Sequence, residues 1–186
     1  PESIFSAISA VHRRIRGAYA VIAMIAGFGM VAFRDPHGIR TLCIGRNEDG
    51  AVMLASESVA SEGTLFQFER DIAPGEAVLI DKQGKLHSRQ CASKTELVPC
   101  LFEYIYLARP DSTIDGISVY QARVNMGVTL AEEVLKHIAK SDIDAVIPIP
   151  ESSRPGAMRL AQHLGTPYRE DAAKNRDVGR TFVMPW

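Results

Sequence analysis

Hydrophobic positions in the first part of the chain follow a helical spacing and then a strand-like spacing. An amphipathic helix is predicted near the N-terminus, because apolar residues recur at Ile4, Phe5, Ile8, Val11 and Ile15 and Gly17 ends the run. Three pairs of strand-like segments follow, at 18–26 with 29–33, 41–45 with 51–55, and 76–80 with 86–89. A single helix followed by hairpins is typical of the β-rich half of an α+β layered domain.

The second part of the chain alternates between strand and helix patterns. It follows the segment 90–100, which is polar, lacks periodicity and contains Pro99. The predicted order is a strand at 102–107, a helix at 121–140, a strand at 145–149, a helix at 155–164 and a short strand near Tyr168. This order is typical of a parallel α/β sheet whose ligand-binding loops lie at the carboxyl ends of the strands. The sequence therefore predicts two domains, at 1–92 and 93–186.

The segment 145–164 carries the clearest candidate site. Its predicted strand leads through a short polar loop into a helix, and a helix N-terminus presents unpaired N–H groups and a positive dipole end to an anion. Ser152 and Ser153 place hydroxyl groups where a phosphate, or its metal ion, would lie. Either serine would alternatively cap the helix by accepting an N–H bond. The pattern leaves both interpretations open.

A cationic segment follows this helix. Lys174, Arg176 and Arg180 lie around Gly179. Three positive charges close to a glycine predict a mobile loop that covers a bound phosphate. Closure of such a loop would balance the charge of the phosphate and exclude water from it.

Composition and charge exclude several classes of protein. The chain has 186 residues, of which 46% are hydrophobic, so it can bury a sizeable core. Lys plus Arg number 21 and Asp plus Glu number 22, so no global field favours nucleic acid or a membrane surface. No apolar run reaches the roughly 18 residues that a membrane-spanning helix needs. We expect a cytoplasmic protein.

The cysteines and histidines predict neither a disulfide framework nor a metal centre. Cys43, Cys91 and Cys100 are odd in number and unclustered, which favours a reducing compartment. An iron–sulfur cluster needs four thiolates, so none is expected in this chain. The five histidines lack the spacing of metal ligands.

Three further polar segments are interpreted from their neighbours. The segment 34–38 is predicted to be a turn in which Asp35 accepts backbone N–H bonds and Gly38 supplies a positive φ. Glu57, between two serines, is predicted to anchor a loop. The segment 109–112 follows a predicted strand, and a ligand site and a domain interface both remain open for it.

Four sequence blocks stand in a specific order along the chain. They are GMVAFRDPHGIR at 29–40, ASESVA at 55–60, FEYIYLARPDS at 102–112 and IPIPESS at 147–153, and the cationic segment 174–182 follows them. Together they resemble the amidophosphoribosyltransferase family, the glutamine-dependent enzymes that open purine synthesis. The resemblance implies the C-terminal part of an N-terminal-nucleophile glutaminase layered domain, followed by the first half of a type I phosphoribosyltransferase α/β domain.

The same resemblance implies a reaction and its ligands. Glutamine would be hydrolysed through a cysteine thioester, and ammonia would pass internally to 5-phosphoribosyl diphosphate, giving 5-phosphoribosylamine. The implied ligands are 5-phosphoribosyl diphosphate, glutamine, Mg²⁺ and purine nucleotide inhibitors, and a homo-oligomer is implied as well.

The resemblance also implies roles for individual residues. Ser152 and Ser153 would bind the phosphoribosyl diphosphate, with Ser152 also a ligand of Mg²⁺. Lys174, Arg176 and Arg180 would bind its diphosphate group, and Tyr106 would line the ammonia channel. Asp177 stands where the family pattern leads us to expect an aromatic residue.

Neither active site is expected to be complete in this chain. The nucleophile of the family is an N-terminal cysteine, whereas residue 1 is Pro. The phosphoribosyltransferase fingerprint, an apolar strand that ends in paired acids and a glycine–threonine turn, does not occur in the sequence. We therefore expect an internal fragment that contributes no catalytic residue. The alternative is a non-catalytic phosphate- or nucleotide-binding module, or a truncated regulatory paralogue.

Overall fold

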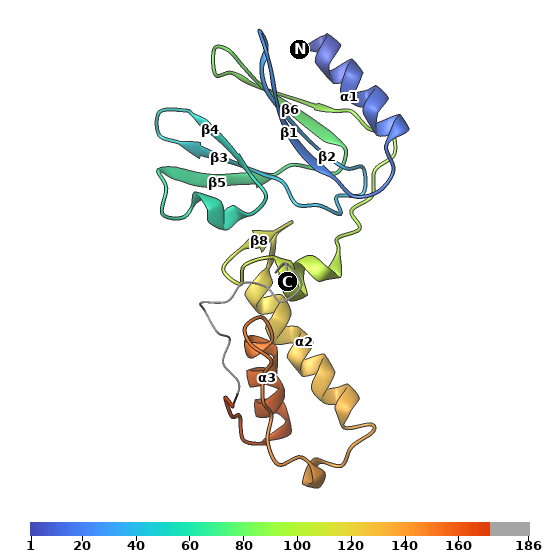
Figure 1. The fold of residues 1–186 in the computed structure, drawn as a ribbon, viewed down its shortest axis with the longest axis vertical. Helices are drawn as coiled ribbons and strands as arrows, with labels where there is room; N and C mark the ends of the chain where they lie inside the picture. Colours follow the sequence, from blue (N-terminus) through green and yellow to red (C-terminus); the bar gives the residue numbers. More distant parts are fainter. Residues whose placement is uncertain (172–186) are drawn as a thin grey trace, which may run out of the picture. The chain divides into compact units, whose positions relative to one another are not determined.

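A computed structural model describes residues 1–171 of the chain (Figure 1). The chain forms two compact units, Pro1–Val119 and a second unit from Tyr120 onward. Both helices and strands are present, as the sequence predicts. The first unit ends after the predicted domain boundary at 92/93, which is defined by a change of sequence pattern and stays a prediction. No helix among the described residues has the length and apolar character needed to cross a membrane.

The first unit begins with a helix that covers one face of a four-stranded sheet (Figure 1). The helix α1 spans Glu2–Arg14. The antiparallel sheet has the order β1-β2-β6-β7, with strands at Ala20–Ile25, Gly29–Arg34, Glu76–Asp81 and Leu86–Gln90. Alternate residues of β2 point to opposite faces, so Val31 and Phe33 pack against Phe5 and Ile8 of α1.

The other face of this sheet packs against a second sheet. That sheet has the antiparallel order β4-β3-β5, with strands at Val52–Ala55, Cys43–Asn47 and Phe66–Asp71. Ala32 of β2 and Val78 of β6 share a core with Ile44 of β3. The predicted helix and all three predicted hairpins are confirmed. The strand β5 is not among the predicted elements.

The first unit also contains several short elements. They are the 3₁₀-helix η1 at Ser58–Ser61, the π-helix η2 at Glu103–Leu107, and a small hairpin of β8 (Thr113–Ile114) and β9 (Ile117–Ser118). The strand predicted at 102–107 is therefore wrong. The N–H of Ala108 donates to the carbonyl oxygen of Glu103 at 2.9 Å, and Glu103 and Tyr104 are both buried although they are adjacent. Adjacent residues of a strand would point to opposite faces.

The second unit contains two helices and a parallel β-bridge. The helix α2 spans Val119–Val134, η3 spans Lys140–Asp142 and α3 spans Arg154–Leu164. The predicted helix at 121–140 ends earlier than expected, and the predicted strand at 145–149 is reduced to a parallel bridge between Val146 and Tyr168. A strand is defined by its partners, and among residues 120–171 only this bridge pairs with the segment. Val146 packs with Ala161 and Leu164 of α3.

A close crossing of α2 and α3 fixes the position of the first turn of α3. A Cβ atom on Gly127 would lie 2.2 Å from the carbonyl oxygen of Gly156, and one on Gly156 would lie 3.2 Å from that of Arg123. Only glycine at position 127 lets the two backbones approach this closely. The loop that precedes α3 is therefore held at a set distance from α2.

Candidate functional site

The predicted phosphate site lies in the loop between the bridge residue Val146 and α3. Ser153 stands at the N-cap position of α3, but its side chain accepts no N–H bond from the helix. Its Oγ instead donates to the carbonyl oxygen of Ile149, which lies earlier in the same loop. The hydroxyl of Ser152 forms no hydrogen bond with any described residue. In this structure neither serine caps the helix.

The start of α3 has the properties of an anion site. The first turn of a helix carries N–H groups without intrahelical acceptors, and the helix dipole adds partial positive charge. Pro155 lies in this turn and has no N–H to satisfy. The N–H of Arg154 donates to the carbonyl oxygen of Glu151 at 3.4 Å. Among the described residues, the N–H of Gly156 and the Ser152 hydroxyl are therefore the donors of this turn that are available to a phosphate.

A further cation lies at this loop that the loop pattern does not single out. Arg154 is the first residue of α3 and follows Ser153 directly. Its guanidinium forms ion pairs with Glu151 in the loop and with Glu170 after the β-bridge. The only sequence signal for this residue is its place next to the two serines.

The remaining predicted site residues are three cations and Tyr106. Lys174, Arg176 and Arg180 lie outside the described residues. Tyr106 lies in the π-helix η2 and is 44% exposed. Its ring packs against that of Phe102 at 5.3 Å between centroids. A π-helix is a rare conformation that occurs frequently at functional sites.

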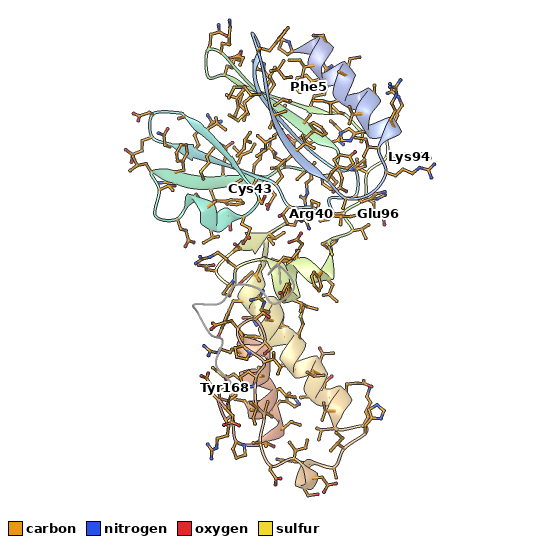
Figure 2. All side chains as sticks on the ribbon, viewed as in Figure 1. Phe5, Arg40, Cys43, Lys94, Glu96 and Tyr168 are labelled. Carbon is orange, nitrogen blue, oxygen red and sulfur yellow. The ribbon has the colours of Figure 1, made fainter. Side chains whose placement is uncertain are left out.

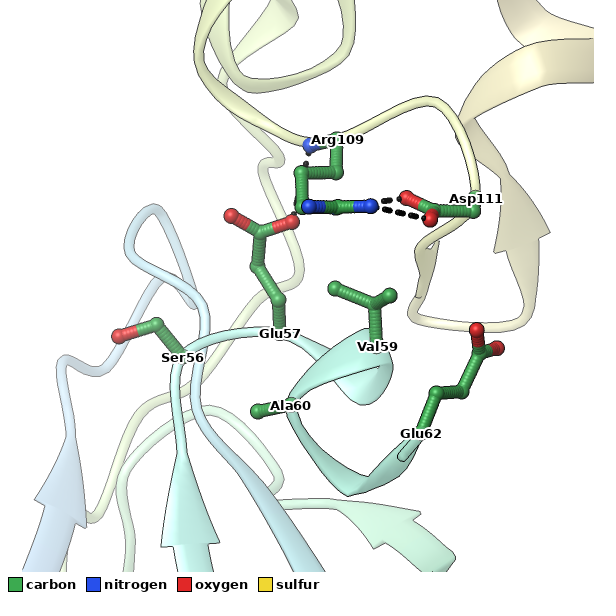
Figure 3. Close-up of a pocket in the computed structure, with 7 residues that line it drawn as sticks. All are labelled: Ser56, Glu57, Val59, Ala60, Glu62, Arg109 and Asp111. Carbon is green, nitrogen blue, oxygen red and sulfur yellow. Dashed lines mark hydrogen bonds and ion pairs between the residues drawn. The ribbon is translucent and has the colours of Figure 1, made fainter. Parts of the chain in front are cut away.

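An open pocket of about 470 Å³ lies in the first unit between the loop 56–62 and the loop that carries Arg109 and Asp111 (Figure 3). Glu57 accepts hydrogen bonds from the backbone N–H of Arg109 at 2.9 Å and from the Ser112 hydroxyl at 2.6 Å. The predicted loop-anchoring role of Glu57 is confirmed. The guanidinium of Arg109 bonds both carboxylate oxygens of Asp111, and this contact lowers the pKa of Asp111.

The predicted turn at 34–38 is built around a buried carboxylate. Asp35 accepts N–H bonds from His37, Ile39 and Arg40 at 2.9, 3.2 and 3.0 Å, and a longer one from Tyr19 at 3.4 Å. Gly38 has a φ of 59°, as expected for its place in the turn. The carboxylate of Asp35 therefore stabilises the turn by accepting its backbone N–H bonds.

Arg34, beside this turn, is 1% exposed, and every N–H donor of its guanidinium is paired. Its Nε donates to the carbonyl oxygen of Arg40, and its two terminal nitrogens donate to those of Ile72 and Gly38. The same two nitrogens bond both carboxylate oxygens of Asp115, at 2.7 and 2.8 Å. This network ties the hairpin β8–β9 to the two sheets.

The described residues contain no group of three or more His, Cys, Asp or Glu side chains arranged to hold a metal ion. All three cysteines are free thiols. Cys43 lies inside the first unit (Figure 2), where burial, with added repulsion from Asp71 and Glu57, raises its pKa to about 12. Burial also raises the pKa of Cys91. Both thiols therefore stay protonated at neutral pH and are poor nucleophiles and metal ligands.

Comparisons with known proteins agree over the whole chain, although no family model matches it. The chain is 56% identical over 188 residues to the amidophosphoribosyltransferase of Escherichia coli (strain K12), a match that covers 99% of this chain and 37% of the relative. It is 53% identical over 189 residues to the amidophosphoribosyltransferase of Pasteurella multocida (strain Pm70), covering 100% of this chain and 38% of the relative.

A solved structure is similar as well. It is the glutamine phosphoribosylpyrophosphate (PRPP) amidotransferase from B. subtilis complexed with ADP and GMP, with a TM-score of 0.79 and 37% sequence identity. The match covers 96% of this chain and 37% of that chain. The chain thus spans less than two fifths of the length of the proteins it matches.

Proposed function

This chain belongs to the amidophosphoribosyltransferase family, and on that premise we propose that it is part of an enzyme that transfers ammonia from glutamine to 5-phosphoribosyl diphosphate. The products would be 5-phosphoribosylamine, pyrophosphate and glutamate, in the first committed step of de novo purine synthesis. Similarity over the whole chain carries this proposal, since 99% of it aligns at 56% identity with the E. coli enzyme. The match covers 37% of that relative, so the reaction is proposed for the whole protein.

We assign the two units to the two halves of this reaction. The helix and two packed sheets of Pro1–Val119 support assignment to the glutaminase part. The parallel bridge that flanks α3 supports assignment of the second unit to the beginning of a type I phosphoribosyltransferase domain. No residue of this chain is assigned to the glutaminase nucleophile.

The phosphate groups are proposed to bind at the start of α3. Ser153 and the N–H of Gly156 would contact the diphosphate, and Ser152 would offer a hydroxyl that has no partner among the described residues. The described residues hold no carboxylate cluster for a dedicated metal site. Mg²⁺ usually takes few protein ligands and several phosphate oxygens or waters, so a single hydroxyl from Ser152 fits it only together with the diphosphate. When bound, the ion would neutralise charge on the leaving pyrophosphate.

Four more residues of this chain are proposed to take part in the reaction. Lys174, Arg176 and Arg180 would close over the diphosphate and exclude water, which protects ammonia and the labile product. Tyr106 would line the ammonia channel, supported by its half-exposed aromatic ring on η2. Asp177 would place a carboxylate near that channel, where the family pattern has an aromatic residue.

The remaining ligands and the setting follow from the family. Glutamine would be the ammonia donor. Purine nucleotides would act as inhibitors, supported by the ADP and GMP in the B. subtilis complex. A homo-oligomer in the cytoplasm is proposed. A non-catalytic nucleotide-binding module is not favoured, because the similar proteins are named as the enzyme.

The proposal is tested on the full-length protein that contains this segment. We expect release of pyrophosphate from 5-phosphoribosyl diphosphate with either glutamine or ammonium as nitrogen donor, and glutamate only with glutamine. Ser152→Ala is expected to raise the KM for 5-phosphoribosyl diphosphate about tenfold, because a charge-assisted hydrogen bond to phosphate is lost.

Ser141→Ala is the matched control, since Ser141 is exposed and bonds only to its neighbour Asp142 among the described residues. It is expected to leave the KM unchanged. A purified wild-type protein that releases no pyrophosphate with either nitrogen donor would show that the proposed function is wrong.

A further inference from the structure

Arg154 lies next to the candidate diphosphate site, and its guanidinium has only weak partners. Its two terminal nitrogens lie 3.7 Å from Oε2 of Glu151 and 3.5 Å from Oε2 of Glu170. Both distances exceed those of a well-formed charge-assisted hydrogen bond. Its Nε is buried and has no hydrogen-bond partner among the described residues. The guanidinium is therefore held by charge attraction rather than by a complete set of hydrogen bonds.

Arg34 of the same chain provides a comparison, because its guanidinium is fully hydrogen-bonded. Arg34 pairs all five donors at 2.7 to 2.8 Å and is 1% exposed. The side chain of Arg154 is 34% exposed, and its two partners are about half-exposed. Ion pairs of this kind contribute little to stability. A stronger acceptor at the start of α3 would therefore draw Arg154 away at small cost.

The two carboxylates have a clear electrostatic consequence for this loop. Glu151 precedes the serines and Glu170 follows the β-bridge, where Tyr168 donates a hydrogen bond to its Oε1 at 3.0 Å. Without Arg154, both acids would repel an incoming anion. With Arg154 between them, one of the two charges is balanced. A diphosphate offers several charged oxygens and accepts a guanidinium in the bidentate geometry that neither glutamate provides here.

We propose that Arg154 is a diphosphate-binding residue. Its ion pairs with Glu151 and Glu170 hold the guanidinium beside the phosphate site until the ligand binds. This inference rests on the proposed function, because it assigns a residue to the phosphate site at the start of α3. Binding of the diphosphate transfers the guanidinium from the carboxylates to the phosphate oxygens. The two acids thereby set the affinity, since they compete with the ligand for Arg154.

A purely structural role predicts a different pattern of effects. If Arg154 only fastened the segment after the β-bridge to α3, removal of either partner would loosen the loop and weaken ligand binding. Competition predicts opposite signs: loss of Arg154 weakens binding and loss of Glu170 strengthens it. Glu170→Gln keeps an acceptor for the Tyr168 hydroxyl, so it removes the charge with little change of shape.

The test measures the dissociation constant of inorganic pyrophosphate with Mg²⁺ by calorimetry on the full-length protein. Arg154→Ala is expected to weaken binding about tenfold, and Arg154→Lys to restore part of the loss, because lysine keeps the charge but not the bidentate fork. Glu170→Gln is expected to tighten binding about threefold. Arg159→Ala is the control on the same helix, since Arg159 bonds to Gln162 and does not contact Glu151 or Glu170.

The outcomes separate this inference from the proposed function. Wild-type protein that binds pyrophosphate and turns over 5-phosphoribosyl diphosphate, with unchanged affinity in Arg154→Ala, would overturn the inference alone. Weaker binding in both Arg154→Ala and Glu170→Gln would also overturn it, in favour of the structural role. Wild-type protein that does neither would overturn the proposed function first.

Discussion

At the scale of single residues, the first unit depends on one buried guanidinium with a fixed counter-ion. Asp115→Asn is expected to lower the free energy of unfolding of this unit by about 3 kcal/mol, because it leaves the charge of Arg34 without its bidentate carboxylate. Asn tolerates a positive φ, so the turn at position 115, where φ is 49°, should keep its shape. Urea unfolding of the wild type and the variant measures the difference.

The neighbouring carboxylate Asp71 is the control for this effect. Burial, and then the charge of Asp115, raises its pKa in the folded state. A raised pKa means that ionised Asp71 opposes folding, and this penalty grows as the pH rises above the unfolded pKa and is complete above the folded pKa. Asp71→Asn removes the penalty and keeps an acceptor for the Asp115 N–H. At pH 7 it should leave stability unchanged or raise it; a loss as large as that of Asp115→Asn would contradict the assignment.

At the scale of single residues, the sequence alone predicted only part of the candidate site. The serines could be found because they stand between a strand pattern and a helix pattern. Arg154 could be located but not interpreted, since no local pattern joins it to its second partner Glu170, which stands 16 residues later. The same holds for Arg34 and Asp115, which a fold brings together over 81 positions. Local patterns predict turns, whereas long-range ion pairs need the fold.

At the scale of secondary-structure elements, the crossing of α2 and α3 positions the candidate phosphate loop. Gly127→Ala would by helix propensity alone stabilise α2 by up to about 1 kcal/mol. The added Cβ would lie 2.2 Å from the Gly156 carbonyl oxygen, however, so the helices must separate. We expect a net loss of about 1–3 kcal/mol from this overpacking, together with weaker pyrophosphate binding. Thermal unfolding and calorimetry on the same variant measure both quantities.

Thr129→Ala is the matched change on the exposed side of α2. It raises helix propensity without approaching α3, so it should keep or slightly raise the unfolding temperature and leave pyrophosphate affinity unchanged. Stabilisation of the protein by Gly127→Ala would mean that the close approach of the two helices does not constrain the loop.

Elements with strong periodicity were predictable, and the failures have physical reasons. Alternation and turn residues were sufficient for α1 and the three hairpins. The apolar run at 102–107 has no decisive period, and tertiary packing selected a π-helix in which Glu103 and Tyr104 are both buried. The segment at 145–149 has a strand pattern, but a strand also needs partners, and within residues 120–171 it has a single bridge. Propensity cannot supply the missing partners.

At the scale of the whole molecule, the division into two compact units predicts which regions a destabilising substitution affects. Contacts concentrate within Pro1–Val119 and within the part from Tyr120 onward. The ion pair of Arg34 with Asp115 belongs to the first unit, and the close approach of Gly127 to Gly156 belongs to the second. Native-state hydrogen exchange reports the opening free energy of each region separately, so it can show whether the units open independently.

We expect Asp115→Asn to accelerate amide exchange in β2 and β6 and to leave exchange in α3 unchanged. Gly127→Ala should have the reverse effect, since its damage lies in the packing that holds α3. Each variant thus serves as the control of the other, measured by mass spectrometry on the same set of peptides. Accelerated exchange in both units after either substitution would mean that the two units open in a single cooperative event. Ligand binding at α3 would then change the opening free energy of the β-sheets as well. Independent opening of the two units would exclude this coupling.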